Sequence, residues 1–107
     1  MKKIQVEDIK FEKQKLLPII IQDYSTSQVL MLAWVSENSL KKTVASGLMT
    51  YWSRSRNCLW VKGETSGNYQ KVKSIYLDCD EDCLLAKVEQ IGPACHTNNK
   101  SCFFQRL

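Results

Sequence analysis

Leu16-Leu17-Pro18-Ile19-Ile20-Ile21-Gln22 and Val29-Leu30-Met31-Leu32-Ala33-Trp34-Val35 are the two apolar stretches that decide the fold. Both are rich in the β-branched and large apolar side chains that favour strands. The residues between them, Asp23-Tyr24-Ser25-Thr26-Ser27, have the composition of a turn. Pro18 cannot donate a backbone hydrogen bond, which indicates an edge strand or a strand start. We therefore predict two antiparallel strands, with the second, near-continuous run buried.

A short helix is predicted after this hairpin. Ser36 is a suitable N-cap, Glu37 stands in the first turn, and Gly47 supplies a C-terminal stop. Leu40 and Val44 lie four residues apart and would form one apolar stripe. The rest of the chain alternates short apolar runs with polar loops. The expected strands are residues 49–55, 59–62, 72–77, 84–91 and 102–105.

Residues 84–91 are compatible with a helix or a strand, and Gly92 and Pro93 end the segment in either case. Strand periodicity places Leu84, Ala86 and Val88 on one face, and we favour the strand. The sequence thus predicts an α+β fold that is mostly antiparallel sheet with a short helix. Residues 1–107 are expected to form a single domain.

Length and composition exclude several classes of protein. A chain of 107 residues with 44% hydrophobic residues fits one small core, and a dimer would bury more surface. Its longest apolar run is far shorter than the roughly 18 residues of a membrane span, and the N-terminus lacks the apolar segment of a signal peptide. Five cysteines, an odd number, argue against a disulfide framework. We expect a cytoplasmic protein with no membrane partner.

The net charge of +4 suits an anionic ligand such as a phosphorylated metabolite. No basic run with interleaved aromatic residues occurs, so nucleic acid is not an expected partner. Arg54 and Arg56 would share a face of an extended chain, where guanidinium groups fit phosphate oxygens. The loop at residues 62–68 adds hydroxyls and glycines, although such loops are often only turns. The candidate substrate-binding residues are Arg54, Arg56, Lys62, Glu64, Thr65, Ser66 and Gly67.

Asp78, Asp80 and Asp82 alternate in the segment Asp78-Cys79-Asp80-Glu81-Asp82-Cys83. On a strand they would share one face at intervals of about 6.5 Å, and a divalent cation would relieve their repulsion. The spacing also matches a calcium loop closed by Glu89, but Cys83 stands where that loop needs glycine, and the preceding segment alternates like a strand. A solvated acidic turn without metal is the other interpretation.

Cys95 and Cys102 flank a loop, residues 96–101, that is long enough to fold both sulfurs back on one ion. Cys79 is a good third ligand, because its acidic neighbours already attract a cation. Three protein ligands leave a position for water, which is typical of catalytic zinc. The alternatives are a closed structural site with His96 as fourth ligand, and thiols that are simply buried.

His96, the only histidine, directly follows a proposed ligand. Adjacent residues of an extended chain point apart, so His96 is expected to face the water or substrate and not the same ion. Zinc with three thiolates polarises water less than zinc with three histidines, so a nearby proton acceptor helps. We predict His96 as the catalytic acid or base, with Glu64 as a weaker candidate.

Five motifs, each present once, follow one another along the chain: Val29-Leu30-Met31-Leu32-Ala33-Trp34, Tyr51-Trp52-Ser53-Arg54-Ser55-Arg56, Leu59-Trp60-Val61-Lys62-Gly63-Glu64-Thr65-Ser66-Gly67-Asn68, Asp78-Cys79-Asp80-Glu81-Asp82, and Ala94-Cys95-His96-Thr97 through Ser101-Cys102-Phe103. With these motifs the chain resembles the phosphoribosyl-AMP cyclohydrolase family from about residue 17 to residue 104. Ser27 and Asn98 stand where many relatives have glycine, and Asn68 where many have histidine.

The resemblance implies an intertwined homodimer. Zinc would be bound by Cys79 of one chain with Cys95 and Cys102 of the other, and magnesium at Asp78, Asp80 and Asp82. It also implies hydrolytic opening of the adenine ring of phosphoribosyl-AMP between N1 and C6, which yields the formimino-carboxamide ribonucleotide of L-histidine biosynthesis. The pyrophosphohydrolase domain that is fused to some relatives is expected to be absent.

A mechanism consistent with these residues starts from the ring itself. Ribosylation of N1 makes the ring cationic, so that C6 is electrophilic and N1 can leave. Water activated by zinc would attack C6, and His96 would move the proton. Two other functions compete with this hypothesis. One is a metal-stabilised binding module without an open coordination position, and the other is a zinc protein that binds nucleic acid, against which the even scatter of Lys and Arg argues.

Overall fold

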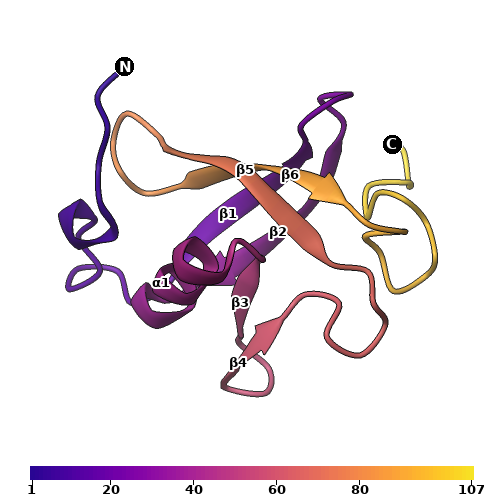
Figure 1. The fold of residues 1–107 in the computed structure, drawn as a ribbon, viewed down its shortest axis with the longest axis horizontal. Helices are drawn as coiled ribbons and strands as arrows, with labels where there is room; N and C mark the ends of the chain where they lie inside the picture. Colours follow the sequence, from indigo (N-terminus) through magenta and orange to yellow (C-terminus); the bar gives the residue numbers. More distant parts are fainter.

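A four-stranded sheet with the order β2-β1-β6-β5 forms the centre of the computed structural model, which describes residues 1–107 (Figure 1). Its strands are β1 (Leu17–Asp23), β2 (Val29–Val35), β5 (Gln70–Leu77) and β6 (Leu84–Gln90). A second sheet pairs β3 (Thr50–Ser53) with β4 (Cys58–Val61), and the single α-helix, α1, spans Glu37–Ser46. A short 3-10 turn, η1 (Val6–Asp8), precedes them. The predicted α+β class is confirmed.

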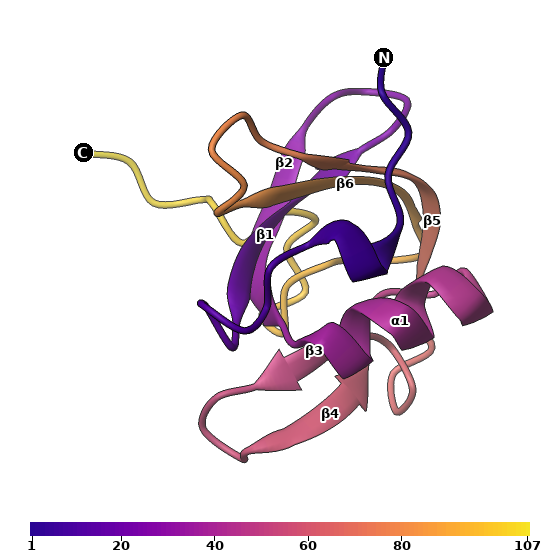
Figure 2. The ribbon, with the colours of Figure 1, turned by 90° about the vertical axis from the view of Figure 1, so that its left-hand side faces the viewer.

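The helix α1 packs against β3 and β2, and β3 itself packs against β2, so the small sheet adjoins the large one directly (Figure 2). The main core lies between these layers, where Tyr51 of β3 and Leu40 of α1 are fully buried against the large sheet. No helix in the structure has the length and apolar character that a bilayer crossing requires.

The strand β1 lies inside the large sheet. It pairs with β2 in antiparallel fashion, as predicted, and with β6 in parallel fashion on its other side. The interpretation of Pro18 as an edge residue is wrong, whereas a strand start is right. Pairing with β6 begins only at Ile19, so the missing N–H of Pro18 costs no hydrogen bond to that strand.

The strand β2 occupies an edge of the sheet and is therefore only partly buried. Leu30 and Val35 are buried, but Val29 is 43% and Leu32 48% exposed. The prediction of a buried strand is thus wrong for one of its faces. By contrast, β6 is a strand with Leu84, Ala86 and Val88 buried, which confirms the interpretation favoured above.

Two predicted strands end differently in the structure. Residues 54–57 form a turn, so β3 stops at Ser53 and β4 starts at Cys58. Residues 102–105 form no strand, because only the Cys102 N–H bonds to the edge strand β2, at the Leu30 carbonyl, and the Phe103 N–H turns back to the Ser101 hydroxyl. The side chains of Phe103 and Phe104 are exposed there.

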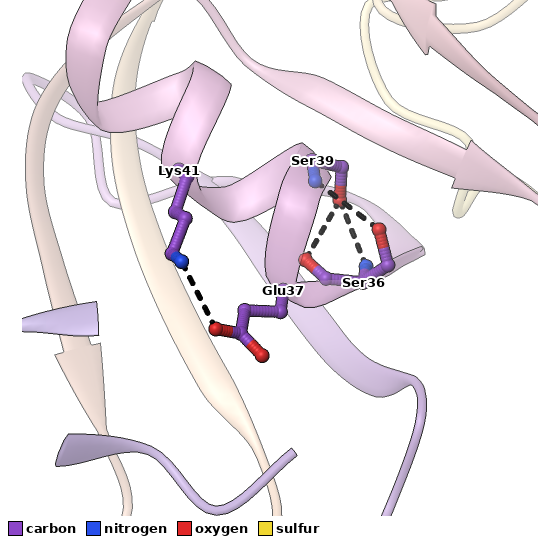
Figure 3. Close-up of polar contacts among 4 residues, drawn as sticks. All are labelled: Ser36, Glu37, Ser39 and Lys41. Carbon is purple, nitrogen blue, oxygen red and sulfur yellow. Dashed lines mark hydrogen bonds and ion pairs between the residues drawn. The ribbon is translucent and has the colours of Figure 1, made fainter. Parts of the chain in front are cut away.

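The start of α1 follows its sequence signals (Figure 3). The Ser36 hydroxyl accepts a hydrogen bond from the Ser39 N–H at 3.1 Å, and the Ser39 hydroxyl accepts one from the Ser36 N–H at 2.8 Å. Such a cap contributes about 1 kcal/mol. The ion pair between Lys41 and Glu37, at 3.1 Å, is exposed and contributes little. The helix ends at Gly47, whose φ of 78° glycine adopts without strain.

The prediction of an apolar stripe formed by Leu40 and Val44 is right for Leu40 and wrong for Val44. Leu40 is buried, but Val44 is 61% exposed. Thr43 takes the second buried position, because its hydroxyl donates to the Ser39 carbonyl at 2.8 Å and accepts from the Thr50 N–H at 2.9 Å. These bonds join α1 to β3.

Asp23 organises the turn between β1 and β2. Its Oδ2 accepts hydrogen bonds from the hydroxyl and backbone N–H groups of Ser25 and Thr26, at 2.8–3.2 Å. These bonds, that of the Ser25 hydroxyl first, lower the pKa of Asp23 to about 2. Ser27 has a φ of 64°, so the turn adopts the left-handed conformation without glycine.

Asp23→Ala should therefore lower the free energy of unfolding by about 1–2 kcal/mol near neutral pH. The native pKa of about 2 lies below the ordinary value of 3.8, so the stabilisation by ionised Asp23 is complete above that value. It should fade as the pH falls from about 4 to about 2. Urea unfolding of both proteins across this range measures the difference. Glu12→Ala, at an exposed position, is the control, and a deficit that stayed constant with pH would contradict the expectation.

Candidate active site

Cys95 and Cys102 meet on the loop that follows β6. We call residues 94–102 the cysteine loop. It closes on itself through hydrogen bonds from the Cys95 N–H to the Asn99 carbonyl at 3.1 Å and from the Asn98 N–H to the Cys95 carbonyl at 3.0 Å. Asn98 has a φ of 69°, a left-handed conformation suited to glycine. Each of the two thiols is among the causes of the other's shifted pKa, so the side chains of Cys95 and Cys102 lie near each other.

The two thiols have different surroundings. The Thr97 hydroxyl donates to Cys95 Sγ at 3.0 Å, and this bond is the first cause of a lowered pKa for the Cys95 thiol. Burial raises the pKa of Cys102, and Cys95 raises it further. Cys95 is therefore the thiol of the pair that ionises first, and a bound cation would favour ionisation of both.

The cysteine loop is fastened to β2 at its far end. The Ser101 hydroxyl donates to the Val29 carbonyl at 2.8 Å, and the Cys102 N–H donates to the Leu30 carbonyl at 2.7 Å. At its near end, Lys62 Nζ donates to the Ala94 carbonyl at 2.6 Å. Lys62 was expected to bind phosphate, and in the structure its ammonium is bound to this loop.

A buried polar network lies beneath these residues. Tyr51 is fully buried, its hydroxyl donates to Gln70 Oε1, and burial raises its pKa, with Cys102 as a further cause. Gln70 Nε2 donates to Gln90 Oε1 at 2.7 Å and to Met31 Sδ at 3.4 Å. Sequence reasoning missed this network, because isolated polar residues on separate strands carry no signal that they meet.

The turn after β5 brings the three aspartates together. Their carboxylate oxygens all lie within 4.8 Å of one another, and all three side chains are exposed. The prediction that the aspartates lie on a strand is wrong, because residues 78–83, which we call the aspartate turn, form a turn. In this turn, Asp78 Oδ1 accepts hydrogen bonds from the N–H groups of Asp82 and Cys83 at 2.9 and 3.1 Å. Hydrogen bonds to Asp78 and then Asp80 raise the pKa of Asp82 to about 6. This set of hard oxygen donors fits magnesium or calcium.

The calcium-loop alternative does not fit the structure. Glu89, its required closing ligand, lies within β6 opposite Lys71 and forms an ion pair with Lys73 at 3.7 Å. The segment before Asp78 is the strand β5 and not a helix. The aspartates are therefore not part of an EF-hand.

Cys79 projects from the aspartate turn and is exposed. The aspartate turn and the cysteine loop lie at opposite ends of β6 (Figure 1), whose seven residues span roughly 20 Å. Within one chain, Cys79 is thus not close to Cys95 and Cys102. His96 is exposed on the cysteine loop and makes no side-chain hydrogen bond, so its imidazole is free to meet a ligand.

A cavity of about 180 Å³ beside β4 gathers most of the expected phosphate-binding residues. Gly67 lies next to it, where its N–H donates to the Gly63 carbonyl at 2.7 Å. Arg54 does not share a strand face with Arg56, because both belong to the turn after β3. Instead, the Arg54 guanidinium lies 4.4 Å from the ring centroid of Trp34. The candidates that line the cavity are Arg56, Lys62, Glu64, Thr65 and Ser66.

Comparison with known proteins gives a consistent result. The family model described as phosphoribosyl-AMP cyclohydrolase matches residues 31–104. The phosphoribosyl-AMP cyclohydrolase of Clostridium botulinum (strain Okra) is 59% identical over 92 residues, which cover 86% of this chain and 84% of that protein. The protein of the same name from Cereibacter sphaeroides is 50% identical over 99 residues, covering 92% and 83%.

A longer relative also matches. The histidine biosynthesis bifunctional protein of Caldanaerobacter subterraneus subsp. tengcongensis is 57% identical over 102 residues, which cover 95% of this chain but only 50% of that protein. The chain thus spans about half the length of this bifunctional relative and most of the length of the two monofunctional ones. On the extent of the family match and the identity to these full-length relatives, the chain belongs to the phosphoribosyl-AMP cyclohydrolase family.

Proposed function

We propose that this chain catalyses the hydrolytic opening of the adenine ring of phosphoribosyl-AMP, between N1 and C6, in L-histidine biosynthesis. The observation that carries the proposal is the split arrangement of the thiols. Cys95 and Cys102 meet on one loop, while Cys79 is displayed at the other end of β6. A second copy of the chain can bring its own Cys79 to the pair, so the active unit is an intertwined homodimer of single-domain subunits.

The donor sets fit two different metals. Cys95 and Cys102, with Cys79 of the partner subunit, offer the thiolates that zinc prefers, and all five cysteines of the chain are free. Asp78, Asp80 and Asp82 offer the oxygens that magnesium prefers. When bound by these three thiolates, zinc would lower the pKa of a water molecule, which would serve as the nucleophile. A reducing cytoplasm would keep these thiols available.

The chain's own residues would move the protons and hold the substrate. The oxygen of water adds to C6 and becomes the carboxamide oxygen, the N1–C6 bond breaks, and N1 takes up a proton. His96, exposed next to Cys95, would remove the proton from water and deliver it toward the ring. The cavity beside β4 would receive a phosphate of the substrate. The proposed substrate-binding residues are Arg54, Arg56, Glu64, Thr65, Ser66 and Gly67. Lys62 lines the same cavity, and its ammonium binds the Ala94 carbonyl.

Removal of zinc should abolish turnover. We expect purified protein to open the ring of phosphoribosyl-AMP, followed by ultraviolet absorbance, and to lose this activity when a chelator strips the zinc. Zinc should restore it, and magnesium alone should not, because only the thiolate-bound ion activates water. Cys58→Ser, at an exposed thiol outside the proposed site, should behave like the wild type. Full turnover by protein shown by metal analysis to be free of zinc would contradict the mechanism, and no turnover in any metal state would favour a binding module.

A further inference from the structure

Lys62 follows β4 and reaches across to the cysteine loop. Its backbone N–H donates to the Met49 carbonyl at 3.0 Å, which holds the residue at the end of the small sheet. Its Nζ donates to the Ala94 carbonyl at 2.6 Å, and the ammonium lies 5.8 Å from the ring centroid of Trp60. The side chain is half-buried. Both its backbone and its ammonium therefore have defined partners before any substrate binds.

The charge of Lys62 has no carboxylate partner. The ion pairs of the chain join Lys41 to Glu37 and Lys73 to Glu89. Burial lowers the pKa of Lys62, while the thiolates of Cys102 and then Cys95 act in the opposite direction. The groups near this ammonium that can become negative are thus the two thiols of the cysteine loop, one residue and eight residues beyond the carbonyl that it binds.

The contact with Ala94 complements the anchors at the other end of the cysteine loop. There, Ser101 and Cys102 are bonded to backbone carbonyls of β2. Lys62 ties the near end to β4, so each thiol stands next to one anchor. Without the near anchor, this end would be held only by bonds within the loop, from the Ala94 N–H to the Lys100 carbonyl and from the Cys95 N–H to the Asn99 carbonyl. The position of Cys95 relative to Cys102 would then be less tightly defined.

We propose that Lys62 is a positioning residue of the zinc site, which fastens the near end of the cysteine loop and places a positive charge beside two ligand thiolates, rather than a ligand of substrate phosphate. The inference rests on the proposed function, because it requires zinc at Cys95 and Cys102. Three thiolates and Zn²⁺ carry a net charge of about −1, which a nearby ammonium offsets in a partly buried site. The hydrogen bond to the Ala94 carbonyl already directs this ammonium toward the cysteine loop.

Three variants separate the two roles. Lys62→Met removes charge and donor, Lys62→Gln keeps an N–H donor without charge, and Lys62→Arg keeps both. Zinc affinity is measured by competition with a chelator in the absence of substrate, and Co²⁺-substituted protein reports ligand geometry through its absorption spectrum. We expect Lys62→Met to raise the zinc Kd about 10- to 100-fold, with a changed Co²⁺ spectrum. Lys62→Gln should be intermediate, and Lys62→Arg should recover most of the affinity. With saturating zinc, KM should stay within about twofold of wild type.

Two further variants calibrate the result. Arg56→Met, in the same cavity, should raise KM with an unchanged zinc Kd, and Lys73→Met, on the outer part of β5, should change neither. A raised KM with a wild-type zinc Kd in Lys62→Met would overturn the proposal and assign Lys62 to phosphate. If circular dichroism shows Lys62→Met unfolded, the comparison of Lys62→Gln with Lys62→Arg decides the same question. Zinc binding that survives Cys95→Ser would instead contradict the proposed function itself.

Discussion

A mixture of the Cys79→Ala and Cys95→Ala variants should recover about a quarter of wild-type activity, although each variant alone should be inactive. Random pairing makes about half of the dimers mixed, and a mixed dimer has one intact site of two. That site combines Cys79 of the Cys95→Ala chain with Cys95 and Cys102 of the Cys79→Ala chain. This expectation follows from the structure, because the aspartate turn, which carries Cys79, and the cysteine loop lie at opposite ends of β6.

The experiment is done by co-expression, or by unfolding the two variants together and refolding them, with activity and zinc content measured on the mixture. The matched control mixes Cys95→Ala with Cys102→Ala. Both substitutions then affect the same half of the site, every mixed dimer lacks an intact set, and no recovery is expected. If the first mixture stayed as inactive as the control, the ligands would not be shared between chains, and the proposed dimeric zinc site would be wrong.

Gly63→Ala should lower the free energy of unfolding by about 2–5 kcal/mol, a large part of the 5–15 kcal/mol typical of small domains. Gly63 has a φ of 89°, and a Cβ there would lie 2.5 Å from the Tyr69 nitrogen and 2.7 Å from the Asn68 oxygen. Both atoms belong to the backbone, so neither can rotate away. The strain of the left-handed conformation and the steric overlap therefore add, and the loop beside the cavity at β4 must shift.

Gly47→Ala is the matched control, because its φ of 78° is similar but no atom lies within 4 Å of the added Cβ. It should cost only the strain of the left-handed conformation, about 1–2 kcal/mol. Thermal unfolding of both variants should show a drop in Tm for Gly63→Ala at least about twice that for Gly47→Ala. Equal drops would mean that the loop relaxes freely around Gly63.

Much of the fold could be predicted because its signals are local. The alternation of Leu84, Ala86 and Val88 identified β6, and the cap residues of α1 identified both its ends. The predictions that proved wrong concerned neighbours distant in sequence. Residues 102–105 look like a strand but pair with β2 at Cys102 alone, and Val44 lies on a helix face that the sheets do not cover.

The candidate site divides in the same way. Its chemical types could be recognised from motifs, since cysteines, aspartates and a histidine gather in one quarter of the chain. The spatial arrangement of these groups could not be predicted from the motifs. The aspartates converge through a turn and not through strand alternation, and Arg54 lies on Trp34 instead of beside Arg56. Sequence reasoning treated each segment as extended, whereas the turns set the directions of these side chains.

The sequence by itself determined which stretches become strands or helix and which chemical groups the protein can offer to a metal and a nucleotide. These properties depend on side-chain type and on neighbours a few residues away. Only the tertiary structure decided that β1 and β6 run in parallel, that Cys79 stands at the opposite end of β6 from Cys95 and Cys102, and that Lys62 binds a carbonyl 32 residues away. Such contacts depend on how all the elements pack at once, because a residue's partner across the core is set by the combined register of the strands between them.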